Sequence, residues 1–334
     1  MLNGHIAAGI LLLTIAVIYL AARYIRVPKR AKFPCWGWIG LADILLVEIL
    51  LFQRIPWVTT FFTPLVWTGY LLLSDGLVWS LRGESRLGTA PWHFLALAFW
   101  SVPLWLVFEA YNLRLANWTY VGLPDSIVVR GIGYTWSFAT IWPAIFETAD
   151  LLKALYIFPK PSSKRLVLSR SSRRSMAIAG LICVTVPVVV SVPLGQYLFG
   201  AVWVGFVLLL DPVNDSLGGY SLLRDFQSGR SATLYGFLGS GLVCGLLWEF
   251  WNYWAGARWL YVFPIWQDSR IFEMPLPGYL GFPVFAVECF VMYEFLRTVR
   301  TRFLKSPAGR ELDPAGTTHQ TTEISGSELP RSVA

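Results

Sequence analysis

The chain has 334 residues, of which 55% are hydrophobic and only 14% charged, and its formal net charge is +7. Ordinary globular domains contain roughly 45–50% apolar and about 25% charged residues, so this composition excludes a soluble protein. The four cysteines and three histidines are scattered, without the spacing of metal ligands. We therefore expect neither a metal site nor a cofactor.

Apolar runs recur along the chain at about 20 residues, the length of a bilayer crossing. We predict an all-α, polytopic membrane protein with about nine transmembrane helices. In chain order these are residues 5–25, 36–54, 57–75, 91–112, 131–156, 176–192, 196–211, 232–254 and 277–299. The run at 175–210 is too long for one crossing, so we divide it near Pro187, Pro193 and Gly195 into two short helices joined by a tight turn.

Basic residues cluster after the first helix, in the loop at 160–174 and after the last helix. Nine crossings put all three clusters on one side, which the positive-inside rule makes the cytoplasm. We expect an outside N-terminus, a cytoplasmic C-terminus and a bacterial inner (plasma) membrane. The net charge thus indicates contact with membrane lipids and not with nucleic acid, while the oligomeric state stays open.

Five segments follow from this pattern. They are an N-terminal helix with its basic loop (1–35), a first membrane repeat (36–157), a basic cytoplasmic loop (158–175), a second membrane repeat (176–300) and a tail (301–334). The tail is rich in Ser, Thr, Gly and Pro, a composition that predicts disorder.

An internal repeat relates the two membrane segments at an offset of 140–141 residues. Its members are Glu109, Asn112, Trp118, Tyr120 and Glu147 in the first and Glu249, Asn252, Trp259, Tyr261 and Glu288 in the second. Each unit contains about four helices, an even number that gives both the same orientation. We predict two parallel four-helix repeats, plus the extra N-terminal helix, around a central cavity. Chance similarity among aromatic residues is the alternative.

Carboxylates in apolar helices carry the functional hypothesis, because one at the helix centre costs about 2.5–3.5 kcal/mol. We interpret Glu147 and Glu288 as the first catalytic candidates, with Glu109 and Glu249 second. If they converge on the cavity, desolvation keeps some of them protonated, as general acids require. Alternatively, each Glu accepts hydrogen bonds from its neighbours and only fixes helix packing.

Further residues are candidates for contact with a substrate. They are Asn112, Asn252, Trp118, Tyr120, Trp259, Tyr261, Trp248 and Glu273. The ring face of a tryptophan attracts a cation, and irregular backbone such as the Pro-rich and Gly-rich segment around Glu273 lines cavities in membrane proteins. Aromatic anchoring at the membrane surface and an ordinary outer loop are the alternatives.

Asp75 and Asp211 end predicted helices at matching positions of the two units. With Asp215 the second site has the spacing Asp-x-x-x-Asp, which is seen in aspartates that hold Mg²⁺. The first unit has Trp79 at the matching place, so a symmetric metal site is not supported. We expect both aspartates to cap helices.

At the repeated residues the chain distantly resembles membrane-embedded carotenoid enzymes, the tandem-domain lycopene cyclases and the carotenoid hydratases. Their repeated domains carry an acidic residue before a Trp-x-Tyr element, and then a Pro followed by acidic residues. The likeness covers residues 109–147 and 249–288, although Pro143 and Pro283 are each followed by a single acid here. The resemblance implies proton-initiated cyclisation or hydration of an isoprenoid or carotenoid-like lipid, without metal or redox chemistry.

Two other functions fit the same sequence. One is a small-molecule or lipid transporter with parallel repeats, in which the carboxylates bind protons or substrate. The other is a structural membrane protein without chemistry. If the chain is an enzyme, we expect a closed apolar pocket. If it is a transporter, we expect an aqueous route and broken helices.

Overall fold

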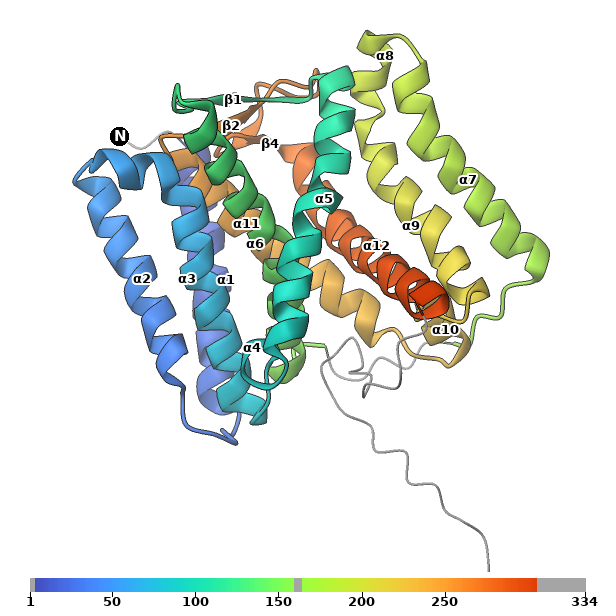
Figure 1. The fold of residues 1–334 in the computed structure, drawn as a ribbon, viewed down its shortest axis with the longest axis horizontal. Helices are drawn as coiled ribbons and strands as arrows, with labels where there is room; N and C mark the ends of the chain where they lie inside the picture. The colour runs from blue at the N-terminus through green and yellow to red at the C-terminus, as the bar shows by residue number, and fades with distance from the viewer. Residues whose placement is uncertain (1–3, 159–163, 305–334) are drawn as a thin grey trace, which may run out of the picture.

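The computed structural model describes residues 4–158 and 164–304, which fold almost entirely into helices (Figure 1). The described part contains nine helices of 18 residues or more. They are α1 (Gly4–Arg26), α2 (Cys35–Phe52), α3 (Pro56–Arg82), α5 (Pro91–Leu115), α6 (Ile127–Ala154), α7 (Arg170–Val189), α9 (Phe199–Ser216), α11 (Ala232–Trp254) and α12 (Gly281–Leu304). The tail predicted to be disordered lies, after Leu304, outside the described residues.

Short elements connect the long helices. The helical ones are α4 (Arg86–Thr89), α8 (Val192–Tyr197), α10 (Leu222–Gln227) and the 3-10 turn η1 (Leu276–Leu280). The strands are β1 (Trp118–Val121), β2 (Arg258–Tyr261), β3 (Arg270–Ile271) and β4 (Met274–Pro275). β1 pairs with β2, and β3 with β4.

Seven helices in the described part are long and apolar enough to cross a membrane: α1, α2, α3, α5, α7, α11 and the segment Leu276–Arg302 that contains most of α12. Large apolar side chains cover their outer faces; in α1, Leu11 is 60% and Ile18 63% exposed. Water solvates such a surface poorly, whereas lipid tails do not penalise it. The chain is therefore a multi-pass integral membrane protein.

The long apolar run at 175–210 does form two helices, as predicted, but the predicted tight turn between them is wrong. The six-residue helix α8 lies between the end of α7 at Val189 and the start of α9 at Phe199. Pro193 lies in the first turn of α8, where its missing N–H needs no partner. The proline thus starts a helix instead of only ending one.

Asp75 and Asp211 cap helices, but not the helices that contain them. Asp75 Oδ2 accepts the Leu87 N–H of α4 at 2.8 Å. The two carboxylate oxygens of Asp211 accept the N–H groups of Leu222 and Leu223 of α10 at 2.8 and 3.0 Å. Each carboxylate satisfies N–H groups that a helix start leaves free. α3 and α9 continue past the aspartates, so the predicted helix ends at 75 and 211 are too early.

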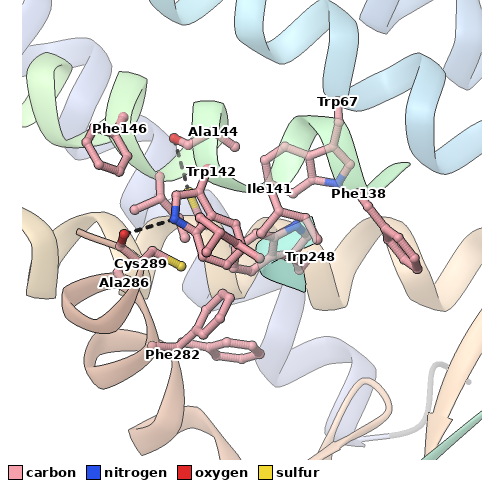
Figure 2. Packing of buried hydrophobic residues seen from close by; sticks show 14 of the residues in the cluster. Trp67, Phe138, Ile141, Trp142, Ala144, Phe146, Trp248, Phe282, Ala286 and Cys289 are labelled. Carbon is pink, nitrogen blue, oxygen red and sulfur yellow. Dashed lines mark hydrogen bonds between the residues drawn. The ribbon is translucent and has the colours of Figure 1, made fainter. Parts of the chain in front are cut away.

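Helices α6 and α12 lie at the centre of the molecule (Figure 1). In the first half α6 contacts α3 and α5, and in the second half α12 contacts α9 and α11. Trp142 of α6, which is fully buried, donates its Nε1–H to the Cys289 carbonyl of α12 at 2.9 Å (Figure 2). This bond satisfies the indole inside an apolar core and ties the two central helices together.

Close approach of α11 and α12 depends on a glycine. A Cβ atom added at Gly241 would lie 2.7 Å from the Pro283 Cα and would also meet the Phe282 backbone. A backbone obstacle cannot turn away as the end of a flexible side chain can. In contrast, Gly236 on the same helix has nothing within 4 Å of its added Cβ.

We predict that Gly241→Ala lowers the stability of the purified protein by about 1–3 kcal/mol, the usual cost of overpacking. Gly236→Ala, the matched control, should leave stability unchanged or raise it slightly, because alanine favours helices. Thermal unfolding in detergent, followed by circular dichroism, measures both. Equal midpoints for the two variants would contradict the close contact.

Candidate functional site

A cavity of about 300 Å³ lies between the two halves of the chain. It is lined by residues of α3, α5, α6, α9, α11 and α12, and β1 and β2 border it at one end. Most of the lining is apolar, and it includes Trp67, Trp105, Trp118, Trp203, Trp248 and Trp259. Arg130 and Arg258 are the only charged residues in the described lining. The cavity is therefore an aromatic chamber suited to an apolar molecule.

Helix α3 bends where it borders the cavity. Phe61 leaves helical geometry with φ −101° and ψ 18°, and Pro64 lies inside the helix three residues later. A proline ring removes one helical hydrogen bond and clashes with the preceding turn, which kinks the helix. Both residues line the cavity, so the bend shapes its wall.

The pairing of β1 with β2 places four aromatic residues on the cavity. Trp118 pairs with Tyr261, and Tyr120 pairs with Trp259, around a central pair of Thr119 and Leu260. Alternate residues of a strand project to the same face, and Trp118, Tyr120, Trp259 and Tyr261 all line the cavity. The structure thus brings these four predicted site residues together.

Asn112 and Asn252 hold the two strands in place. The side-chain carbonyl of Asn112 accepts the Trp118 N–H at 3.0 Å, and its amide donates to the Trp118 carbonyl at 2.9 Å. Asn252 makes the same two bonds with Trp259, also at 3.0 and 2.9 Å. Neither asparagine lines the cavity. They orient the strand residues that do.

Glu109 and Glu249 lie one layer behind the cavity wall, each bonded to a tyrosine of the wall. Glu109 Oε1 accepts the Tyr120 hydroxyl at 2.5 Å, and it also accepts the indole N–H groups of Trp105 at 2.9 Å and Trp118 at 3.3 Å. Among the described residues Glu249 Oε1 accepts the Tyr261 hydroxyl, at 2.8 Å, and the Trp259 indole and the Met274 backbone N–H also favour its charged form. The two carboxyl groups therefore share a position but differ in their hydrogen bonds.

Glu147 and Glu288 are fully buried in α6 and α12, and neither lines the cavity. Their carboxyl oxygens make no hydrogen bond with the described residues. Glu147 lies within electrostatic range of Arg86 and Asp150, which form an ion pair at 2.7 Å. The predicted convergence of all four glutamates on the cavity is therefore wrong, because none of them is among the residues that line it.

The remaining candidates lie in different places. Trp248 lines the cavity, next to the ring of Trp67 at a centroid distance of 5.3 Å (Figure 2). The ring of Phe285 lies 6.1 Å from it. Glu273 does not line it; its carboxylate lies 3.8 Å from Arg258 and 3.7 Å from Arg270. Its position therefore fits a partly buried ion pair of the outer loops.

Several cavity residues escaped the sequence analysis. Trp67, Trp105 and Trp203 line the cavity but belong to ordinary apolar helices. The spacing of Trp105, one helical turn before Glu109, was the one available signal. Trp203 had no such signal. The sequence around an aromatic residue in an apolar helix is similar whether the side chain faces lipid, the protein core or a cavity.

Among the residues described, no group of three or more His, Cys, Asp or Glu side chains is placed to hold a metal ion. Comparisons with protein-family models, with curated proteins and with solved structures gave no match. The interpretation of the site therefore starts from its own chemistry.

The two tyrosines predict a pH dependence. Burial, and then the charge of Glu109, raise the pKa of Tyr120 well above its usual value of 10.0. Burial and Glu249 do the same to the pKa of Tyr261. A raised pKa means that the folded state holds the proton more tightly, so this contribution to stability is complete below about pH 10 and is lost as the pH rises further.

We expect the thermal midpoint of the wild type to fall as the pH increases above about 10. Tyr120→Phe combined with Tyr261→Phe should make this decline shallower. Tyr19→Phe is the control, because Tyr19 is 51% exposed on α1. Circular-dichroism melts in detergent across this pH range measure the slopes, and parallel curves for all three proteins would refute the assignment.

Proposed function

We propose that this chain is a membrane enzyme of isoprenoid chemistry, which binds its substrate in the aromatic cavity and protonates a carbon–carbon double bond. The observation that carries the proposal is the pair of Glu–Tyr hydrogen bonds at the cavity wall. In each pair a glutamate carboxyl group is bonded to a tyrosine hydroxyl that lines the aromatic cavity. The distant resemblance to carotenoid cyclases and hydratases agrees with this chemistry.

The proposal includes the membrane arrangement. We infer nine crossings, counting α6 and α9, with the N-terminus outside and the C-terminus in the cytoplasm of a bacterial cell. We also infer two parallel repeats, α2 to α6 and α7 to α12, with α1 added. The recurring order of elements and the matched bonds of Asn112 and Asn252 support the duplication. The register of β1 and β2 supports a twofold relation, because equivalent residues pair crosswise.

Labelling from each side of the membrane tests this topology. Cys35 is exposed at the start of α2, and Asp125 is exposed just before α6. A membrane-impermeant maleimide should label Cys35 only in inverted vesicles. Asp125→Cys in a Cys35→Ser background should be labelled only in right-side-out spheroplasts. Labelling of both positions from the same side would overturn the arrangement.

The two Glu–Tyr pairs differ in a way that suggests separate roles. Three hydrogen-bond donors converge on Glu109, and such donors stabilise a negative carboxylate. Of the described residues, one donor, Tyr261, lies in ordinary hydrogen-bond geometry to Glu249; the Trp259 indole and the Met274 N–H add to its stabilisation outside that geometry, and its buried Oε2 makes no hydrogen bond with the described residues. Neighbouring carboxyl groups in contrasting surroundings commonly divide into an acid and a base. We assign the acid to Glu249 and the base to Glu109.

The proposed reaction transfers protons and involves no oxidation or reduction of the substrate by an external partner. Tyr261 gives its hydroxyl proton to one alkene carbon and takes a proton from Glu249. The neighbouring carbon becomes a cation, which the faces of Trp248 and other rings stabilise. A second double bond attacks it to close a ring. Tyr120 then removes a proton from carbon while passing its own to Glu109, so the product is an isomer of the substrate.

Heavy water makes the proton transfer visible. We predict that the protein in lipid nanodiscs, supplied with acyclic isoprenoids in D₂O, yields a product that carries one carbon-bound deuterium by mass spectrometry. Glu249→Gln and Tyr261→Phe should each reduce the rate about 10²–10⁴-fold, the usual contribution of a general acid. Asp125→Asn, an exposed control, should keep full activity.

The double variant Glu147→Gln with Glu288→Gln distinguishes two assignments of the catalytic acid: Glu249 at the cavity wall, as proposed here, or the buried pair Glu147 and Glu288, as the sequence suggested. Loss of activity only in this double variant would move the acids from the cavity wall to the buried pair. Absence of any product from a folded, membrane-inserted wild type would refute the enzyme on the substrates tested. Uptake of the same compounds into vesicles would then favour the transporter.

A further inference from the structure

The cavity carries positive charge at one end and none elsewhere. Arg130 lies in the first turn of α6, and Arg258 is the first residue of β2. Both line the cavity, and no acidic side chain in the described part of the chain does. Both arginines are partly buried, and Arg258 has a long ion pair with Glu273, but a purely apolar substrate would gain nothing from two cations in the lining, since removing charge from water is costly.

The two arginines lie at the same edge of the β1–β2 pair. Arg258 is paired with Val121, the last residue of β1. Arg130 donates from Nε and Nη2 to the carbonyl of Pro124, three residues after Val121, at 3.3 and 3.1 Å. The chain between them turns sharply at Gly122, whose φ is +68° and whose added Cβ would meet the Gly256 backbone. The Arg130 guanidinium and the backbone of Arg258 thus lie around one tight turn, and both arginines line the cavity.

Each arginine keeps donors free for a ligand. A guanidinium has five N–H donors. Among the described residues, Arg130 donates to the Pro124 carbonyl through two nitrogens and to no other acceptor. Arg258 donates from Nη1 to the Tyr253 carbonyl at 2.7 Å, and its ion pair with Glu273 is long at 3.8 Å. The remaining N–H groups form the fork geometry that suits phosphate oxygens.

We infer that the cavity takes an amphipathic ligand, an isoprenoid chain that ends in a phosphate, with the chain among the aromatic rings and the phosphate between Arg130 and Arg258. This inference rests on the proposed isoprenoid function and narrows its substrate class. Protonation at Tyr261 then acts on the chain and leaves the phosphate ester intact. The arginines hold the head group and fix which double bond reaches Tyr261.

Binding to the full chain in nanodiscs tests the inference with three probes: geranylgeranyl phosphate, geranylgeraniol, and a lysophosphatidic acid with a saturated chain. Isothermal calorimetry should show that the wild type binds geranylgeranyl phosphate about 10–100-fold more tightly than the alcohol, as charged hydrogen bonds give. Arg130→Gln with Arg258→Gln should lose this preference, because the phosphate then has no guanidinium partner and gains nothing over the hydroxyl. Arg54→Gln, an exposed arginine outside the cavity, is the control and should behave as wild type.

Each outcome has a distinct meaning. Equal affinity of the wild type for geranylgeranyl phosphate and geranylgeraniol would overturn the head-group site, while binding of the isoprenoid chain in the apolar cavity would still hold. A preference that survives in the double arginine variant would also overturn it. Tight binding of lysophosphatidic acid as well would support the phosphate site but count against the isoprenoid chain. Failure of the folded wild type to bind any probe would overturn both proposals.

Discussion

The antiparallel pairing of β1 with β2 is the contact on which the arrangement of the cavity depends. The four backbone positions in register join segments more than 130 residues apart in the sequence. Within a sheet the register fixes which side chains share a face, so one contact places Trp118, Tyr120, Trp259 and Tyr261 together on the cavity. Asn112 and Asn252 secure the ladder at both strands through their hydrogen bonds to the strand backbone. A shift by one residue would put the two rings of one strand on the face opposite the two rings of the other.

Burial of carboxyl groups is the second constraint, and besides ion pairs such as Arg86 with Asp150, six carboxyl groups of the two halves show three ways of meeting it. Asp75 and Asp211 accept N–H groups at helix starts. Glu109 and Glu249 accept aromatic N–H or O–H groups at the cavity wall. Glu147 and Glu288 have no hydrogen-bond partner among the described residues. A buried carboxyl without partners is expensive to ionise, so the last pair differs in chemistry from the first two.

The separation between acids and cavity has a consequence for the proposed reaction. An aromatic layer makes up much of the cavity wall, and no carboxyl group in the described part of the chain lines it; a carbocation in the cavity would react with a carboxylate oxygen. Hydrogen bonds connect the wall to the two glutamates behind it: the Tyr120 hydroxyl and the Trp105 and Trp118 indoles reach Glu109, and the Tyr261 hydroxyl reaches Glu249. In the proposed function this layer protects the cation, and the hydroxyls carry the proton through it. The two arginines at the sheet end would hold the charged head away from the reacting carbons.

The helices and the repeated residues show what could and could not be predicted from the sequence. The long apolar runs predicted the long helices, because the length and polarity of a segment are local properties. The recurring Glu, Asn, Trp and Tyr marked the region of the cavity, but their spacing could not separate the asparagines that support the strands from the aromatic residues that line the wall. Trp67 and Trp203 gave no signal at all, since an apolar helix does not reveal which face meets a neighbouring helix.

By itself the sequence determined that the chain is a membrane protein, which segments form its long helices, and which polar residues recur. Composition and periodicity are properties of the sequence alone and do not depend on which segments are in contact. Only the tertiary structure decided where those residues point. It put Glu147 and Glu288 outside the cavity lining, and it brought Tyr120 opposite Trp259 and Arg130 near the end of β1. Such placements depend on contacts between distant segments, and a cavity exists only where several helices leave space that their side chains do not fill.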